Sequence, residues 1–227
     1  MNTQPAEKKI FSENGDLEVH SIFKTIQGEG PFSGHRAIFL RLAGCNLQCP
    51  LCDTDYTSGR EFLSVQNILS RINDLCKEQS YLVVITGGEP FRQNIYPIAS
   101  ALLSNGYRVQ VETNGSLYQD LPMGVTIVCS PKTGIVHTAL AMDINAYKYV
   151  LHADEVCADG LPLRALNHPV NVQLARPPKF FRGPVYLQPV DVGDEVENKR
   201  HLVAVLRSVL KHGHTLCLQT HKIVGLE

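Results

Sequence analysis

The sequence predicts an α/β protein, an incomplete TIM-like barrel of mainly parallel strands with few helices. Short apolar runs alternate with helical patterns along most of the 227 residues. Several of these runs are almost continuous in β-branched and large apolar residues, which is typical of strands covered on both faces. Helical periodicity is poor over residues 114–125 and 152–183, so we expect helices to be missing or shortened there.

Eight apolar runs have the length and composition of strands. They are Leu17–Phe23, Ala37–Leu42, Leu82–Ile85, Arg108–Val111, Thr126–Cys129, Tyr147–Leu151, Val185–Leu187 and Thr215–Gln219.

Three segments are expected to be helices. The first follows Ser64, a good N-cap residue, and repeats apolar residues at three- and four-residue spacing as far as Cys76. The second covers about 95–104 and stops at an Asn-Gly pair. The third covers about 198–212 and is closed by Gly213.

Composition limits the class of protein. We expect a flexible polar extension over residues 1–16 and a single domain over 17–227. The chain is 44% hydrophobic, which argues against disorder, and its net charge of -1 argues against a broad basic face for nucleic acid. No apolar stretch approaches the roughly 20 residues of a membrane span, and the N-terminus lacks the apolar core of a signal peptide. Seven cysteines, three of them clustered, favour a reducing compartment, so we expect a cytoplasmic protein without membrane or nucleic-acid partners.

The cysteine cluster is the most informative motif. Cys45, Cys49 and Cys52 are spaced C-x3-C-x2-C. Three thiolates on a four-iron cluster leave one iron free to hold a substrate or cofactor. A zinc site completed by a histidine is the alternative, although the nearest histidines, His35 and His137, give no short zinc-finger spacing. We expect the remaining cysteines to be buried, inert thiols: Cys76, Cys129, Cys157 and Cys217.

Polar or glycine-rich segments follow six of the expected strands. In a parallel barrel these strand ends share one face, where an active site is built. The segments are the cysteine triplet, Thr86-Gly87-Gly88-Glu89-Pro90, Glu112-Thr113-Asn114-Gly115, Ser130-Pro131-Lys132, Gln188-Pro189 and Thr220-His221-Lys222. We therefore expect a pocket on this face.

Two of the glycine-containing motifs have a local rationale. The pair Gly87-Gly88 lets backbone amides approach a ligand, and Glu89 offers a carboxylate to an ammonium group. A plain turn carrying a surface glutamate is the alternative. The segment Gln27-Gly28-Glu29-Gly30 has the same two interpretations, close approach to a ligand or a tight surface turn.

Two further positions leave alternatives open. Arg41 lies inside an otherwise apolar strand. Its planar guanidinium could bind a ligand carboxylate through two hydrogen bonds, or it could form a salt bridge to Glu112 or Glu29. Asp53 and Thr54 follow the last clustered cysteine. Their oxygens would suit Mg²⁺, and helix capping is the ordinary alternative.

The motifs together resemble a known family. The cysteine spacing matches the cluster motif of the radical S-adenosylmethionine (SAM) enzymes, and Thr86–Pro90 resembles the motif that binds the SAM amino group. Other segments are similar to those of the 7-carboxy-7-deazaguanine synthases, from about residue 18 to the C-terminus. They are Gln27-Gly-Glu-Gly30, Arg41-Leu-Ala-Gly-Cys45, Cys52-Asp-Thr54, Glu112-Thr-Asn-Gly115, Ser130-Pro-Lys132 and Leu187-Gln-Pro189.

The resemblance implies a lyase of queuosine and 7-deazapurine biosynthesis. A [4Fe-4S] cluster bound by Cys45, Cys49 and Cys52 would chelate SAM on its open iron, and reduction would give a 5'-deoxyadenosyl radical. That radical would take hydrogen from C6 of 6-carboxy-5,6,7,8-tetrahydropterin. Rearrangement with loss of ammonia would give 7-carboxy-7-deazaguanine, and SAM would be regenerated. Mg²⁺ would bind through Thr54.

The resemblance also implies roles for individual residues and partners. The SAM side would comprise Leu51, Asp53, Gly88, Glu89, Ser130, Pro131, Lys132 and Gln188. The pterin side would comprise Ile26, Gln27, Gly28, Glu29, Arg41, Thr86 and His221, with Arg41 clamping the carboxylate. A homodimer and an electron donor of the flavodoxin or ferredoxin type are implied as partners.

Two rival interpretations stay open. A radical SAM activase of a glycyl-radical enzyme would explain the cysteines and Gly-Gly-Glu-Pro, but not Gln27-Gly-Glu-Gly30 or Cys-Asp-Thr. A zinc-stabilised binding module without catalysis would explain the cysteines alone.

Overall fold

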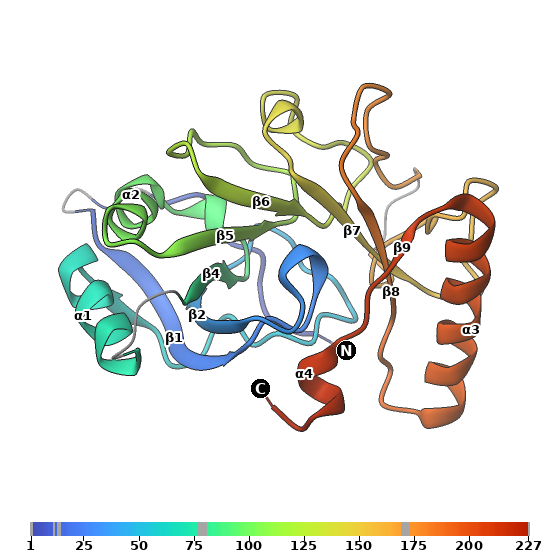
Figure 1. The fold of residues 1–227 in the computed structure, drawn as a ribbon, viewed down its shortest axis with the longest axis horizontal. Coiled ribbons are helices and arrows are strands. Elements are labelled where there is room, and N and C mark those ends of the chain that lie inside the picture. Colours follow the sequence, from blue (N-terminus) through green and yellow to red (C-terminus); the bar gives the residue numbers. More distant parts are fainter. Residues whose placement is uncertain (1, 11, 13–14, 77–80, 169–172, 227) are drawn as a thin grey trace.

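The computed structural model describes residues 2–10, 12, 15–76, 81–168 and 173–226. In this part of the chain one sheet holds nine strands, in the order β3-β1-β2-β4-β5-β6-β7-β8-β9. The bounds are β1 (Leu17–Ile26), β2 (Arg36–Leu42), β3 (Glu61–Leu63), β4 (Leu82–Gly87), β5 (Arg108–Thr113), β6 (Val125–Cys129), β7 (Ala146–Leu151), β8 (Val185–Pro189) and β9 (Thr215–Leu216). The sheet curves into an open barrel, which confirms the predicted fold class (Figure 1).

Strands β2 and β4 to β9 run parallel to one another, whereas β1 and β3 are antiparallel additions at the β2 edge. Antiparallel β1 runs three residues beyond its predicted end at Phe23, because Ile26 pairs with Arg36 at the start of β2. The short strand β3 was not expected from the sequence. It has only three residues, too few to show an alternating pattern.

The helices are few, as predicted. They are α1 (Val65–Leu75), α2 (Tyr96–Ser104), α3 (Glu195–His212) and the four-residue α4 (Thr220–Ile223). The Ser64 side chain accepts from Asn67 N, so the predicted N-cap is confirmed. Helix α3 begins three residues earlier than expected because Asp194 caps it, accepting from Glu197 N. Three short 3-10 helices complete the list: Gly30–Phe32, Pro90–Arg92 and Leu140–Met142.

The two faces of the sheet differ in composition. Apolar side chains such as Ile38, Leu40 and Leu42 on β2 point to the outer face, where α1 and α2 complete the main core. The alternate positions point inward, and there Ala37 and Phe39 join a small second cluster. Because successive side chains of a strand point to opposite faces, the polar residues between apolar ones gather inside the barrel. None of the helices in the described residues combines the length and apolar character that crossing a bilayer requires.

Candidate active site

The cysteine loop, residues 45–56, follows the carboxyl end of β2 and contains no helix or paired strand. All seven cysteines are free. Burial raises the pKa of the Cys45 thiol to about 12, and burial also raises the pKa of Cys49 and Cys52. Because metal binding needs thiolates, loading of the site is coupled to loss of these protons.

The loop after β4 lies directly against the cysteine loop. Gly88 N donates to Leu42 O at 3.2 Å, and Glu89 N donates to Gly44 O at 3.0 Å. A Cβ placed on Gly88 would lie 2.1 Å from Gly44 O and 2.8 Å from the Cβ of Cys45. Only glycine allows this approach, so Gly88 sets the distance between the two loops.

Substitution of Gly88 by alanine is expected to push the two loops apart. Because the obstructing atoms belong to the backbone, we expect a loss of about 1–3 kcal/mol in the free energy of unfolding of the metal-free protein. Iron content after reconstitution should fall as well. Chemical denaturation and iron analysis measure the two effects. Gly193→Ala is the comparison. Its Cβ would meet nothing within 4 Å, but Gly193 has a φ of +72°, so this variant should lose some stability through backbone strain and still keep full iron content. Equal iron in both variants would contradict the role of Gly88.

Glu89 is fully buried and is held by protein donors. Its Oε1 accepts from Phe91 N at 3.0 Å and Thr113 Oγ1 at 2.7 Å, and its Oε2 accepts from Asn114 N at 2.7 Å. Burial raises the pKa of this carboxyl, while the three donors oppose the rise. The surface-glutamate alternative is wrong. Glu89 joins the β4 and β5 loops, and one lone-pair position on Oε2 remains for a further donor.

The loop after β6 brings a cation to the cysteines. Lys132 Nζ donates to Ser130 O at 3.0 Å and to Ser130 Oγ at 2.6 Å, and Pro131 between them is buried. Burial lowers the pKa of Lys132, and the charges of Cys49 and Cys52 act against that shift, so the ammonium lies within electrostatic range of both thiols.

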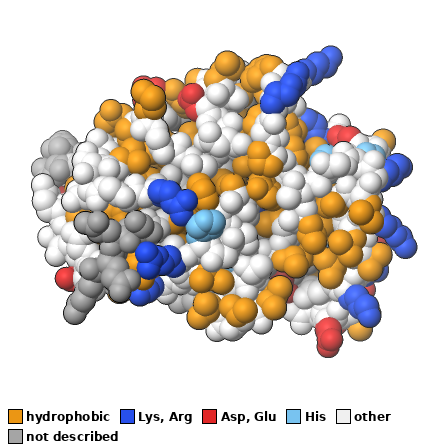
Figure 2. Space-filling model, viewed as in Figure 1, with side chains coloured by type: hydrophobic (Ala, Val, Ile, Leu, Met, Phe, Trp, Pro, Cys, Tyr) orange, Lys and Arg blue, Asp and Glu red, His pale blue; other side chains and the backbone are white. Residues whose placement is uncertain are grey.

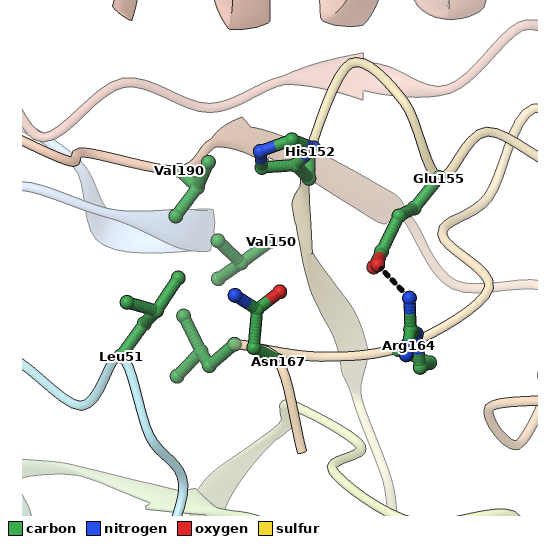
Figure 3. A pocket seen from close by; sticks show the side chains of 8 residues that line it. Leu51, Val150, His152, Glu155, Arg164, Asn167 and Val190 are labelled. Atoms are coloured by element: carbon green, nitrogen blue, oxygen red, sulfur yellow. Dashed lines mark hydrogen bonds and ion pairs between the residues drawn. The ribbon is translucent and has the colours of Figure 1, made fainter. Parts of the chain in front are cut away.

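Leu51 fixes the middle of the cysteine loop to the opposite wall of the barrel. Its side chain faces Val150 and Val190, at the ends of β7 and β8, across a hollow of about 10 Å³ that Asn167 also lines (Figure 3). Its backbone N donates to Leu166 O at 3.2 Å. The hollow has room for about one water molecule, so it holds the loop rather than a ligand.

A wider cleft opens beside the second half of the cysteine loop. Its volume is about 490 Å³, and Cys52, Asp53, Thr54, Asp55 and Asp191 are among the residues that line it. Thr54 Oγ1 lies 3.4 Å from Asp53 Oδ1. Four of the lining residues thus carry carboxylate or hydroxyl oxygens: Asp53, Thr54, Asp55 and Asp191. A helix-capping role for Asp53 and Thr54 is wrong, because no helix follows them directly.

The inside of the barrel holds a network of buried charges. Lys148 on β7 is 6% exposed and donates to Glu29, and to Glu112 Oε2 at 2.8 Å. Gln27 Nε2 donates to Glu112 Oε1 at 2.9 Å, and Gln219 Nε2 donates to Glu29 Oε1 at 2.9 Å. Burial alone would raise the pKa of Glu29, but the Lys148 ammonium outweighs it and holds that pKa at about 2. The segment 27–30 thus enters the barrel, and the surface-turn alternative for it is wrong.

His221 on α4 completes this wall of the barrel. A Cβ on Gly28 would lie 1.8 Å from His221 Nδ1, so only glycine leaves room for the imidazole. That Nδ1 is buried and has no hydrogen-bond partner among the residues that the structure describes. Burial lowers the pKa of His221, so the ring is neutral near pH 7 and has a nitrogen available to a ligand.

The remaining predicted residues lie at the ends of neighbouring strands. Arg41 pairs in register with Thr86, and its guanidinium lies 5.1 Å above the ring of Phe23. Ile26 is the last residue of β1. Gln188 on β8 is buried and accepts from Cys217 Sγ at 3.5 Å. The Arg41 side chain is half-buried.

Sequence reasoning did not single out Lys148 or Gln219, and it named Glu112 only as part of a motif and as a possible partner of Arg41. Lys148 had a usable signal, since it is a lysine in the middle of an apolar run, the pattern that drew attention to Arg41. Gln219 had none, because it was placed inside an expected strand that ends instead at Leu216. Among the other cysteines, Cys76, Cys129 and Cys217 are buried as expected, but Cys157 is half-exposed.

The donor set fits an iron–sulfur cluster with an open iron. In the described residues no group of three or more His, Cys, Asp or Glu side chains converges on a point where one ion could sit. A four-iron cluster needs no such convergence, because its protein thiolates bind different iron atoms. The close approach of the Gly88 backbone to the cysteine loop and the Lys132 amine in electrostatic range of the thiols place backbone groups and a cation next to the cysteines, which suits a ligand with an amino and a carboxylate group.

Comparison with known proteins places the chain in a family. Residues 40–122 match the model of the radical SAM superfamily. The chain is 42% identical to the 7-carboxy-7-deazaguanine synthase of Rhodospirillum rubrum, over 98% of this chain and 97% of that protein. It is 38% identical to the synthase of Rickettsia prowazekii, over 97% and 93%. The crystal structure of QueE from Escherichia coli has the same fold, with a TM-score of 0.68 at 22% identity, over 91% of this chain and 98% of that chain. The chain therefore belongs to the 7-carboxy-7-deazaguanine synthase family of radical SAM enzymes.

Proposed function

We propose that the protein converts 6-carboxy-5,6,7,8-tetrahydropterin to 7-carboxy-7-deazaguanine with release of ammonia, in 7-deazapurine and queuosine biosynthesis. The observation that carries this proposal is that a single barrel brings a cysteine site and a buried polar network together. Three thiols and a glycine-lined loop lie at the carboxyl ends of the strands, and a buried network of donors and acceptors lies inside.

Cys45, Cys49 and Cys52 would hold the cluster, while Gly88, Glu89, Ser130 and Lys132 would line the SAM side. Bound there, the reduced cluster and SAM supply the radical that starts the reaction. The chain's own contribution is to hold both groups at a fixed distance and to keep water out. Buried Glu89 and the close contact of Gly88 with the cysteine loop support this assignment.

The pterin would bind to the inner network. A pterin edge alternates N–H donors with carbonyl and ring-nitrogen acceptors. The carboxylates of Glu29 and Glu112 accept, Gln27 both donates and accepts, and His221 offers its unpartnered Nδ1. Because Lys148 holds the pKa of Glu29 at about 2, that carboxylate stays an acceptor across neutral pH, and Glu112 pairs with the same ammonium. Gly28, Ile26 and Thr86 would add close packing around the ring.

Arg41 would clamp the substrate carboxylate through its two-pronged guanidinium. Arg41→Lys keeps the charge but loses one of the two parallel hydrogen bonds, so we expect KM for the pterin to rise about tenfold with unchanged iron content. Steady-state kinetics and iron analysis measure this. Arg36→Lys, at the exposed start of the same strand, should leave KM unchanged. If Arg41→Lys binds the pterin as well as the parent protein, the arginine has only a structural role.

Mg²⁺ would bind near the substrate carboxylate through Thr54. The oxygen-rich wall formed by Asp53, Thr54 and Asp55 supports a hard cation that keeps several waters. Asp53 would lie between this ion and SAM.

We further propose a cytoplasmic homodimer that takes electrons from a flavodoxin- or ferredoxin-type donor. Seven free cysteines support a reducing compartment. Apolar side chains gather over the region of α3 in Figure 2, and Val203, Leu206 and Leu210 on this helix are at least 37% exposed. Such a surface supports association with a second copy. Sedimentation of the purified protein measures its mass.

The deciding experiment is an anaerobic assay of the reconstituted protein with SAM, a reductant and the carboxytetrahydropterin, with and without Mg²⁺. Appearance of the deazaguanine chromophore and of ammonia in equal amounts is the expected result. SAM cleavage without either product would favour the activase. Stoichiometric zinc without sulfide in anaerobically purified protein would favour the non-catalytic module.

A further inference from the structure

Residues 2–10, which we call the N-terminal strap, lie along the cysteine loop. Glu7 N donates to Cys45 O at 2.7 Å, and Ala6 forms a parallel bridge with the same cysteine. Asn2 Nδ2 donates to Cys49 O at 3.1 Å. The sequence predicted only a flexible extension for this segment, whereas it contacts the backbone of two of the three clustered cysteines.

Gln4 makes the largest set of contacts within the strap. Its Nε2 donates to Thr54 O at 2.9 Å, and this carbonyl also accepts from Cys52 Sγ at 3.8 Å. Its Oε1 accepts from Tyr56 N at 2.7 Å and from Thr57 Oγ1 at 3.1 Å. One side chain therefore binds the end of the cysteine loop in both directions, as donor and as acceptor.

The strap is itself anchored to the buried part of the barrel. Glu7 pairs with Arg60, whose Nη1 donates to it at 3.0 Å. Arg92, which is 1% exposed, donates to Lys8 O at 3.1 Å, and Ile10 N donates to Arg92 O at 2.9 Å. The Arg92 contacts anchor the strap to the barrel outside the cysteine loop, whereas Arg60 also donates to Tyr56 O, at the end of that loop, at 3.3 Å. The strap can therefore act as a support for the loop.

Hydrogen bonding, not apolar packing, is what the strap contributes. Among the described residues, the main hydrophobic core takes none of its members from residues 2–10. The cysteine loop has no regular secondary structure, so its backbone groups need partners from elsewhere. Without those partners the loop would have many conformations. The entropy cost of ordering the loop would then reduce the free energy of cluster binding.

We propose that the N-terminal strap is a positioning segment that holds the cysteine loop in the shape required for cluster binding, with Gln4 as its central residue. The inference rests on the proposed cluster ligands, but not on the identity of the pterin substrate. It predicts that loss of Gln4 loosens the loop before any metal binds and speeds the release of iron afterwards.

The test compares Gln4→Ala with the parent protein in two measurements. Hydrogen exchange of the metal-free protein reports on the Tyr56 amide, which loses its acceptor, and we expect exchange on the order of tenfold faster. Release of iron from the reconstituted protein to a chelator should accelerate to a similar degree. Gln4→Glu keeps the acceptor for Tyr56 but loses the donor to Thr54, so it should restore slow amide exchange and only part of the iron retention.

Two controls separate positioning from general stability. Thr3→Ala changes an exposed neighbour in the strap and should behave as the parent protein. Ser208→Ala removes a buried hydrogen bond of α3, from Ser208 Oγ to Gly160 O at 2.6 Å, and should lower the melting temperature without speeding iron release. The proposal is overturned if Gln4→Ala exchanges and releases iron at the parent rate, or if Ser208→Ala accelerates both equally. Failure of the pterin assay alone would count against the proposed function and leave these two measurements valid.

Discussion

Cys49→Ala is expected to abolish cluster assembly and all activity. The thiolate of Cys49 would hold one of three iron atoms, and no other cysteine can replace it, because the remaining four belong to other parts of the barrel. Reconstitution should yield protein without the visible absorption and iron of a [4Fe-4S] cluster, and product should fall to the background of the assay. Absorption spectroscopy, iron and sulfide analysis and the product assay measure this.

The matched control for that experiment is Cys157→Ala. Cys157 is half-exposed, and its backbone, not its thiol, forms hydrogen bonds with Leu161 and Gly160. The control should therefore keep iron, sulfide and activity. A Cys49→Ala protein that retained a full cluster would show that these three cysteines are not its ligands.

Lys148→Met is expected to cost about 3–5 kcal/mol in the free energy of unfolding at neutral pH. The substitution leaves the carboxylates of Glu29 and Glu112 buried without their cation, and an unpaired buried charge is strongly unfavourable. Pterin turnover should fall with it, because these carboxylates would no longer be held in place. Urea denaturation of the metal-free protein measures the stability, and the anaerobic assay measures the turnover.

The direction in which the stability loss of Lys148→Met changes with pH tests whether the lost pairing with Glu29 causes it. In the parent protein the pKa of Glu29 is about 2, below its unfolded value of 4.5. Its stabilising contribution is therefore present above pH 4.5 and is lost as the pH falls toward 2. In Lys148→Met the ammonium no longer opposes burial, although the Gln219 hydrogen bond still does, so the pKa of the same carboxyl rises above its value in the parent protein. Acidification should therefore reduce the stability difference between variant and parent.

An exposed pair serves as the comparison. Arg71 and Glu61 are both about half-exposed, so Arg71→Met removes a cation of a solvated pair and should change the free energy of unfolding far less than Lys148→Met does. The triple variant in which Lys148→Met is combined with Glu29→Gln and Glu112→Gln should recover most of the stability, since no buried charge remains. If Lys148→Met alone is as stable as Arg71→Met, the network is not a buried ion cluster.

Local signals predicted much of the fold. Continuous apolar runs located the central strands, and Ser64 located the start of α1, because strand burial and helix capping depend on neighbouring residues. The element ends were less accurate. Helix α3 begins at Glu195, capped by Asp194, rather than near Asn198, and β9 ends at Leu216. These bounds depend on pairing and capping partners that the apolar pattern does not reveal.

The sequence by itself was enough to identify the cysteine triplet, the glycine pair at Gly87 and Gly88 and the family resemblance. These features depend on residue type and on spacing within a few positions. Only the tertiary structure decided which distant polar groups meet. Lys148 lies 119 positions from Glu29, and Gln219 lies 190 positions from it. The strap's contacts with the cysteine loop likewise join segments that no periodicity relates. The curvature of the sheet and the burial of its inner face bring these groups together, and such packing is a property of the whole chain and not of any single segment.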